Sequence, residues 1–184
     1  MCSSDLHRHH DLSQGDGYNE RCWRAFGADR WTRAPAGGEI SYYEDSDQRR
    51  FLSPKGIHGV TFAAAAAKYH ITFMIANDAP SGRDATPETF RAAAEACGCR
   101  FRIVGDATDG TVRRVRIAND GVAPLYHDAF PAVGEAVSPT SLRGLLPGAT
   151  RDFEIPLPPG TPPDAPLRIV SPKLLPSATL PLFR

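Results

Sequence analysis

The polar groups best placed for chemistry in this sequence are Asn77 and Asp78, which directly follow the apolar run 70–76 (HITFMIA). A run that is mostly apolar on both faces is typical of a strand covered on both sides in a parallel sheet. In such sheets, ligands bind at the carboxyl ends of the strands. An amide and a carboxylate at that point could hold a polar ligand. They could also open the turn 77–82, because Asn, Asp, Pro and Gly all favour turns, and both interpretations stay open.

Two helix-like runs flank this predicted strand, 59–68 (GVTFAAAAAK) and 87–97 (PETFRAAAEAC). The first is rich in alanine, so it can pack closely against a sheet. The second has Thr86 as its N-cap, Pro87 at its first position and Gly98 as its stop signal. The order helix, strand, helix is that of a parallel α/β sheet. Residues at helical spacing predict one apolar packing face on the second helix: Phe90, Ala93, Ala94 and Cys97.

The pattern changes near residue 100, where the hydrophobic period becomes two. Short alternating runs at 101–103, 111–117, 151–157 and 167–170 predict strands, while the proline-rich stretch 156–166 predicts an extended or turn-like connection. The triplet Asn119-Asp120-Gly121 predicts a turn, with Gly121 free to take a positive φ. The spacing of these strands favours an antiparallel β-sandwich. In the run 111–117, Val115 and Ile117 are expected to point inward and Arg114 and Arg116 outward.

Composition excludes several classes of function. The 184 residues include 21 basic and 21 acidic ones, so no net field attracts nucleic acid or an anionic membrane. Arg113, Arg114 and Arg116 therefore favour a solvated strand face over a nucleic-acid patch. No apolar stretch reaches the ~20 residues of a membrane helix, and residues 1–20 are polar where a signal peptide has an apolar core.

No metal site or cofactor is expected. The four cysteines lack zinc-ligand spacing, because Cys97 and Cys99 are separated by one residue and no second pair accompanies them, so small buried residues are the favoured interpretation. The N-terminal cluster His7-Arg8-His9-His10-Asp11 could chelate a divalent metal, although a mobile polar terminus is the commoner reason for such a composition.

Four motifs together carry a resemblance to a known family. They are W-x3-P-x-G-G-E (Trp31, Pro35, Gly37, Gly38, Glu39), the strand at 69–73, V-R-I-A-N-D-G-V-A-P-L-Y (115–126), and Leu142-Arg143 followed by Leu146-Pro147-Gly148. Over residues 30–184 the chain resembles the C-terminal half of bacterial proteins with the domain of unknown function 4832. In that family a (β/α)₈ barrel similar to glycoside hydrolases precedes a β-sandwich.

The resemblance implies an α+β fold: residues 1–99 as the last strands and helices of a (β/α)₈ barrel, followed by an antiparallel β-sandwich at 100–184. It implies a carbohydrate ligand and an extracellular or periplasmic location. Glu39 and Asp78 would be the catalytic pair at the barrel rim, one as acid and the other as nucleophile or base, within ~10 Å of each other. Trp31, Tyr42, Tyr43 and Asn77 would contact the sugar. Each also has a structural interpretation, as a cap, a turn residue or a core aromatic.

Most of a barrel is missing from this sequence, since eight strands typically need ~250 residues. We therefore expect an exposed strand edge or apolar surface within 31–80, covered in the whole protein by the missing barrel half or by an oligomer partner, and no turnover by this chain alone. Two alternatives remain: a non-catalytic carbohydrate-binding or architectural β-sandwich module, and a truncated gene product. Substrate, linkage and oligomeric state cannot be predicted from the sequence.

Overall fold

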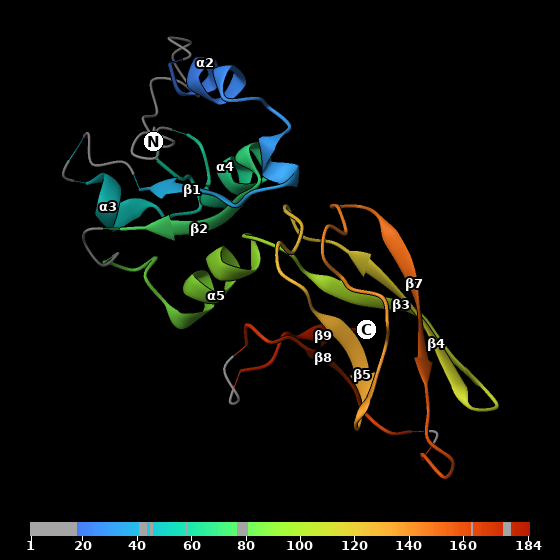
Figure 1. The fold of residues 1–184 in the computed structure, drawn as a ribbon. Helices are drawn as coiled ribbons and strands as arrows, with labels where there is room; N and C mark the ends of the chain where they lie inside the picture. The colour runs from blue at the N-terminus through green and yellow to red at the C-terminus, as the bar shows by residue number, and fades with distance from the viewer. Residues whose placement is uncertain are drawn as a thin grey trace. The chain divides into compact units, whose positions relative to one another are not determined.

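The computed structural model describes residues 18–40, 44, 46–57, 59–76, 81–162, 164–174 and 178–184. The chain is α+β and divides into two units, Met1–Gly98 (unit 1) and Cys99–Arg184 (unit 2) (Figure 1). The helices of the described residues lie in unit 1, whereas unit 2 consists of strands and turns. The change of hydrophobic period near residue 100 therefore accompanies a change from mixed to β structure.

Unit 1 is built around a pair of parallel strands, β1 (Ala36–Glu39) and β2 (Ile71–Ile75). Helices α3 (Asp47–Arg50) and α4 (Phe62–Tyr69) connect the two strands. Helix α2 (Tyr18–Ala25) and a short 3₁₀ helix, η1 (Arg30–Thr32), precede β1, and α5 (Pro87–Glu95) follows β2.

Local sequence explains the ends of the helices in unit 1. The Thr61 hydroxyl accepts a hydrogen bond from the Ala64 N–H at the start of α4, which ends at His70 in a left-handed conformation with φ of 52°. The predicted N-cap of α5 is confirmed. The Thr86 hydroxyl accepts a hydrogen bond from the Thr89 N–H, and the Thr89 hydroxyl accepts one from the Thr86 N–H. The predicted strand 70–76 and helices 59–68 and 87–97 are thus present with small shifts of their ends.

The expected packing face of α5 is only partly correct. Ala93 packs against the cluster around Ile40, and Cys97, just beyond the helix, against the cluster around Ile71. Phe90, however, is 45% exposed, and α5 contains no buried residue. A two-stranded sheet offers α5 too little surface to cover the whole predicted stripe.

Unit 2 contains two sheets that share one core (Figure 1). The four-stranded sheet has the order β7 (Thr150–Pro156), β4 (Val112–Asn119), β3 (Phe101–Asp109), β9 (Leu182–Phe183). The three-stranded sheet has the order β6 (Ala136–Val137), β5 (Phe130–Val133), β8 (Leu167–Val170). All pairs are antiparallel except β3 with β9, which is parallel, so the expectation of a wholly antiparallel module was wrong at this edge.

The core of unit 2 follows the predicted alternation. Val115 and Ile117 are buried, and Arg114 and Arg116 point to solvent. The four-stranded sheet also contributes Phe101, Phe153 and Ile155, and the three-stranded sheet contributes Val133, Ala136 and Ile169. The connection after β7 makes turns at Pro158 and Pro162 and contains no helix among its described residues, as predicted.

Asn119 organises the loops at one end of unit 2. Its side chain is fully buried; Oδ1 accepts the N–H groups of Arg100 and Gly121, and Nδ2 donates to the carbonyls of Ala123 and Leu145. All the hydrogen-bonding capacity of the amide is used, so Asn119 has a structural role in the motif at 115–126. The predicted turn exists, but Gly121 does not adopt a positive φ, because the Asn119 side chain closes the turn instead.

Candidate functional site

The carboxyl ends of β1 and β2 lie together, because the strands are parallel and Glu39 is opposite Ile75. The Ile40 N–H donates to the Ile75 carbonyl and extends the pairing by one residue. Glu39 is the last residue of β1 and is partly buried. Tyr42, Tyr43, Asn77 and Asp78 lie outside the described residues, so the separation of Glu39 and Asp78 stays a prediction.

The strand pair has one covered face and one exposed face. An irregularity in the register places Gly37 opposite Phe73 rather than Thr72, and the Thr72 hydroxyl donates to the Ala36 carbonyl at 2.7 Å. The covered face contains Ala36, Gly38, Ile40, Ile71 and Met74. The exposed face contains Gly37, Glu39, Phe73 and Ile75.

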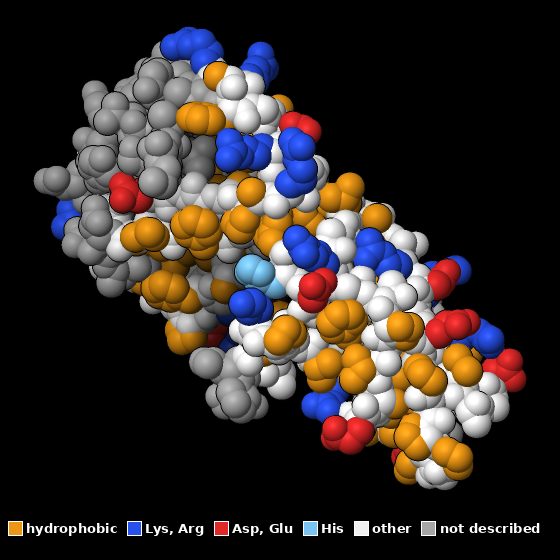
Figure 2. Space-filling model, in the orientation of Figure 1, with side chains coloured by type: hydrophobic (Ala, Val, Ile, Leu, Met, Phe, Trp, Pro, Cys, Tyr) orange, Lys and Arg blue, Asp and Glu red, His pale blue; other side chains and the backbone are white. Residues whose placement is uncertain are grey.

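The exposed face is apolar apart from Glu39. Phe73 is 49% and Ile75 53% exposed, and Figure 2 shows hydrophobic side chains gathered over the β1–β2 pair. The expectation that this strand is covered on both sides was wrong for the described residues, whereas exposed apolar surface was expected between residues 31 and 80. A Cβ added to Gly37 would lie 2.4 Å from ring atoms of Phe73, so the ring lies over Gly37.

Trp31 does not share this site with Glu39. Its ring stacks on His70 with centroids 3.4 Å apart and planes 10° apart. His70 directly precedes β2, so the stack lies at the amino ends of the strands. Glu39 is opposite Ile75, five residues beyond His70 and therefore about 16 Å further along at ~3.3 Å per residue. Trp31 therefore packs on His70 at the end of the strands away from Glu39, and its contact with a sugar stays a prediction.

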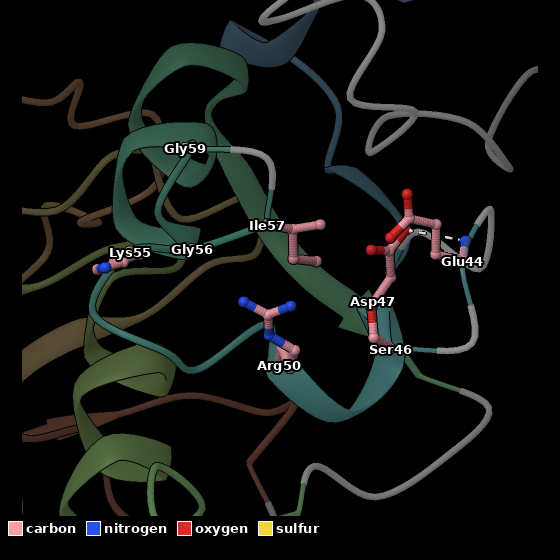
Figure 3. Close-up of a pocket in the computed structure, with 8 residues that line it drawn as sticks. All are labelled: Glu44, Ser46, Asp47, Arg50, Lys55, Gly56, Ile57 and Gly59. Atoms are coloured by element: carbon pink, nitrogen blue, oxygen red, sulfur yellow. Dashed lines mark hydrogen bonds between the residues drawn. The ribbon is translucent and has the colours of Figure 1, made fainter.

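Helix α3 adds a pocket at the carboxyl end of the strands. The Gln48 side chain donates to the Ile40 carbonyl just after β1, and the Ser81 N–H, beyond β2, donates to the Arg49 carbonyl. Between α3 and the segment leading to α4 lies a pocket of about 310 Å³, here called the α3 pocket (Figure 3). Its described lining consists of Glu44, Ser46, Asp47, Arg50, Lys55, Gly56, Ile57 and Gly59.

Charges of both signs line the α3 pocket. Asp47 is buried and accepts the Glu44 N–H on Oδ2, while the Arg50 and Lys55 side chains are exposed and form no ion pair with a described carboxylate. Sequence reasoning missed these residues, because it followed the apolar runs and the aromatic residues and did not consider the charged residues that follow Tyr43. The signal that could have found them is the charged run 44–50, placed in the loop after a strand of a parallel sheet.

Two of the four cysteines can be compared with the interpretation as small buried residues. Cys97 and Cys99 are free and partly buried, and burial raises the pKa of both thiols above the ordinary value. Among the described residues no group of three or more His, Cys, Asp or Glu side chains could hold a metal ion. Cys2 and the cluster His7 to Asp11 lie outside the described residues.

The arginines of β4 are paired with carboxylates. On the outer face of the four-stranded sheet, Arg114 contacts Glu154 at 3.1 Å and Arg116 contacts Asp152 at 2.7 Å. Figure 2 accordingly shows basic and acidic side chains interspersed over unit 2. A shallow groove of about 470 Å³ on this face is lined by the same ion pairs. Arg113 departs from the predicted solvated face: it is buried and contacts Asp106 at 2.8 Å.

Further observations bear on partners and relatives. No described helix combines the length and the apolar character that crossing a membrane requires. Comparisons with protein families, curated proteins and solved structures found no match to this chain.

Proposed function

We propose that this chain belongs to a carbohydrate-active protein related to the glycoside hydrolases, and that it binds a sugar on the exposed face of β1 and β2. In this proposal unit 1 is a remnant of a (β/α)₈ barrel and unit 2 a β-sandwich. The helical connection between two parallel strands supports the first part, and two sheets around one core support the second.

The observation that carries the proposal is the arrangement of Phe73 and Glu39. Both lie on the exposed face near the carboxyl ends of the strands, where ligands of parallel sheets bind. A half-exposed aromatic ring offers a flat surface to the C–H face of a pyranose, and a neighbouring carboxylate can accept hydrogen bonds from its hydroxyls. In unit 2, the strongly exposed large hydrophobic residues of the described part are Val104, Val137 and Leu146, none of them aromatic.

In a catalytic version of this site, Glu39 needs a second carboxyl group on the other side of the scissile bond. Asp78 is the proposed partner, at ~5 to 5.5 Å for retention of configuration or ~6.5 to 9.5 Å for inversion. In the alternative, a binding module, Glu39 only holds the sugar. The openness of the face favours the module. Phe73 and Ile75 are each about half exposed, whereas catalytic sites for hydrolysis usually exclude bulk solvent and admit only the reacting water.

The test is binding and hydrolysis of a panel of soluble oligosaccharides by the wild type, Phe73→Ala and Glu39→Gln. Phe90→Ala is the matched control, because Phe90 is similarly exposed in the same unit but lies on α5. We expect Phe73→Ala to weaken binding about tenfold, or ~1.4 kcal/mol, and Phe90→Ala to leave it unchanged.

The same panel separates the two versions of the function. Binding retained with turnover lost in Glu39→Gln supports catalysis by Glu39. No turnover in either protein, with binding intact, supports the module, and this is the result we expect from the chain alone. Absence of binding to every oligosaccharide, or equal binding by Phe73→Ala and the wild type, contradicts the proposed site.

A further inference from the structure

The α3 pocket has the position and size of a small-molecule site. It lies in the loop after β1, at the end of the strands where ligands of parallel sheets bind. Its volume of about 310 Å³ is at the lower end of the ~300–1,000 Å³ typical of ligand sites, so it suits a ligand of monosaccharide size. The pocket is separate from the exposed face, because the Ile40 and Ile57 side chains near it pack in the cluster on the covered side of the strands.

Arg50 is the group in this pocket that calls for a ligand. Figure 3 shows its guanidinium directed into the space between Ile57 and Asp47. It forms no ion pair with a described carboxylate, although Asp47 lines the same pocket. The arginines of β4 differ, because each is paired with an acidic side chain. A guanidinium left open in a pocket can bind a carboxylate or phosphate with two parallel hydrogen bonds.

A tight turn lines the pocket on the side opposite α3. Gly56 has a φ of 66°, and a Cβ there would lie 1.8 Å from the Val60 carbonyl oxygen. The Ser53 hydroxyl donates to the Gly56 carbonyl, and Ile57 and Val60 exchange backbone hydrogen bonds. This tight turn holds Ile57 against the pocket and places Lys55 at its edge.

The remaining lining indicates what else the ligand carries. Glu44 and Ser46 also line the pocket and present oxygen atoms, whereas the buried Asp47 carboxylate is directed toward Glu44 and accepts its N–H (Figure 3). Oxygen acceptors suit hydroxyl donors, so the complementary ligand is anionic at one end and hydroxylated at the other. From these contacts we infer that the α3 pocket binds a monosaccharide-sized polyol bearing one anionic group, a sugar acid or a sugar phosphate, with Arg50 holding the anion.

The experiment is calorimetric titration of the full chain with D-glucuronate, D-glucose 6-phosphate, D-glucose and inorganic phosphate. We expect at least one charged sugar to bind at least tenfold more tightly than glucose and than phosphate, and the tighter of the two identifies the anion. Arg50→Gln should weaken that binding at least tenfold. Arg49→Gln is the matched control: it removes the same charge from the same helix at a position that does not line the pocket, and should change affinity less than twofold.

Three results would overturn the inference. If Arg49→Gln and Arg50→Gln weaken binding equally, the ligand is attracted by the general positive charge of the helix and not by Arg50 in the pocket. If glucose binds as tightly as the charged sugars, the anionic group does not contribute to binding. If phosphate binds as tightly, the sugar hydroxyls do not contribute. Absence of binding to both charged sugars overturns it as well. The test is distinct from that of the exposed face, because Phe73→Ala should leave binding in the α3 pocket unchanged.

Discussion

The Phe73 ring of β2 lies over the backbone of Gly37 in β1, in a space that a methyl group would fill. Gly37 has an ordinary strand conformation, since it is absent from the residues with positive φ, so the glycine is needed for space and not for backbone freedom. The glycine in one strand thus determines where the aromatic surface of the other strand lies.

Gly37→Ala should displace the Phe73 ring and weaken sugar binding as much as Phe73→Ala does. The ring is half exposed and can rotate toward solvent, and alanine is favoured over glycine in a strand, so the free energy of unfolding should change by less than about 1 kcal/mol. A ligand-free measurement is available: the ring current of Phe73 should shift the Gly37 Hα resonance upfield, and Phe73→Ala should remove that shift.

Gly105→Ala is the control for this prediction. Gly105 is also a strand glycine without a positive φ, but a Cβ there meets the Arg116 Cβ at an ordinary 3.4 Å. It should leave sugar binding unchanged. If Gly37→Ala binds sugar like the wild type, the Phe73 ring in its position over Gly37 is not the contact surface.

Most of the secondary structure could be predicted from local signals. The caps Thr61 and Thr86 and the alternation at 112–117 depend on neighbouring residues in the chain, and the structure has the corresponding elements near their expected ends. Strands β5, β6 and β9 were missed. Strand β5 has four residues and contains Pro131, whereas β6 and β9 have two residues each and show no periodicity. The pairing of β9 with β3 also joins segments about 80 residues apart in sequence. The burial of Arg113 was also missed, because the sequence pattern does not show that Asp106 pairs with it.

The candidate site was predicted less well, since a site depends on which residues tertiary contacts bring together. Glu39 was singled out by the resemblance to a known family, and the structure places it at the end of β1. The exposure of Phe73 could not be inferred, because the sequence of an apolar strand does not show whether one or both faces of its sheet are covered. The stacking of Trp31 on His70 could not be inferred either, because the two residues are 39 positions apart in sequence.

Asn119→Ala should destabilise unit 2 severely. It would leave two N–H groups and two carbonyls, at present 2.8–3.0 Å from the amide atoms, without partners in a buried loop. Each buried polar group without a partner costs ~1–3 kcal/mol, and water can reach some of these groups. We therefore expect the free energy of unfolding to fall by about 3–5 kcal/mol. Hydrogen exchange of unit 2 amides measures it. Thr108→Ala, an exposed change on β3, should stay within about 0.5 kcal/mol of the wild type, and a similarly small effect of Asn119→Ala would show that the amide does not organise these loops.

Tyr126 should titrate above the ordinary range of a tyrosine. Burial, and secondarily the negative charge of the Cys99 thiolate, raises the pKa of Tyr126 to about 12. Because this value lies above the ~10 of an unfolded tyrosine, the stabilisation is fully present below pH ~10 and is lost as the pH rises through about 12. NMR titration of the ring carbons measures the pKa directly, and Cys99→Ser should lower it. Tyr126→Phe should reduce the alkaline loss of stability of unit 2, and an unchanged loss would argue against this assignment.

Asp106 should link the stability of unit 2 to acid pH. It accepts two hydrogen bonds of 2.8 Å from Arg113, whose side chain is only 6% exposed, and the Arg113 guanidinium also donates to the Ala165 carbonyl. The hydrogen bonds from Arg113 lower the pKa of Asp106. A carboxyl group with a lowered pKa stabilises the fold above its unfolded value of ~3.9, and that contribution is lost as the pH falls through the folded value.

Asp106→Asn should therefore destabilise unit 2 at pH 7 by about 2–3 kcal/mol, somewhat less than the ~3–5 kcal/mol for breaking a fully buried pair, because a fifth of the Asp106 side chain is exposed. It should also flatten the fall in stability below pH 4, measured by urea unfolding at a series of pH values. Asp152→Asn is the matched control, because Asp152 makes the same two-hydrogen-bond contact with Arg116 but on the solvent face. Its effect should be clearly smaller, since exposed ion pairs contribute little. Equal effects of the two substitutions would mean that burial of Arg113 adds nothing to the pair.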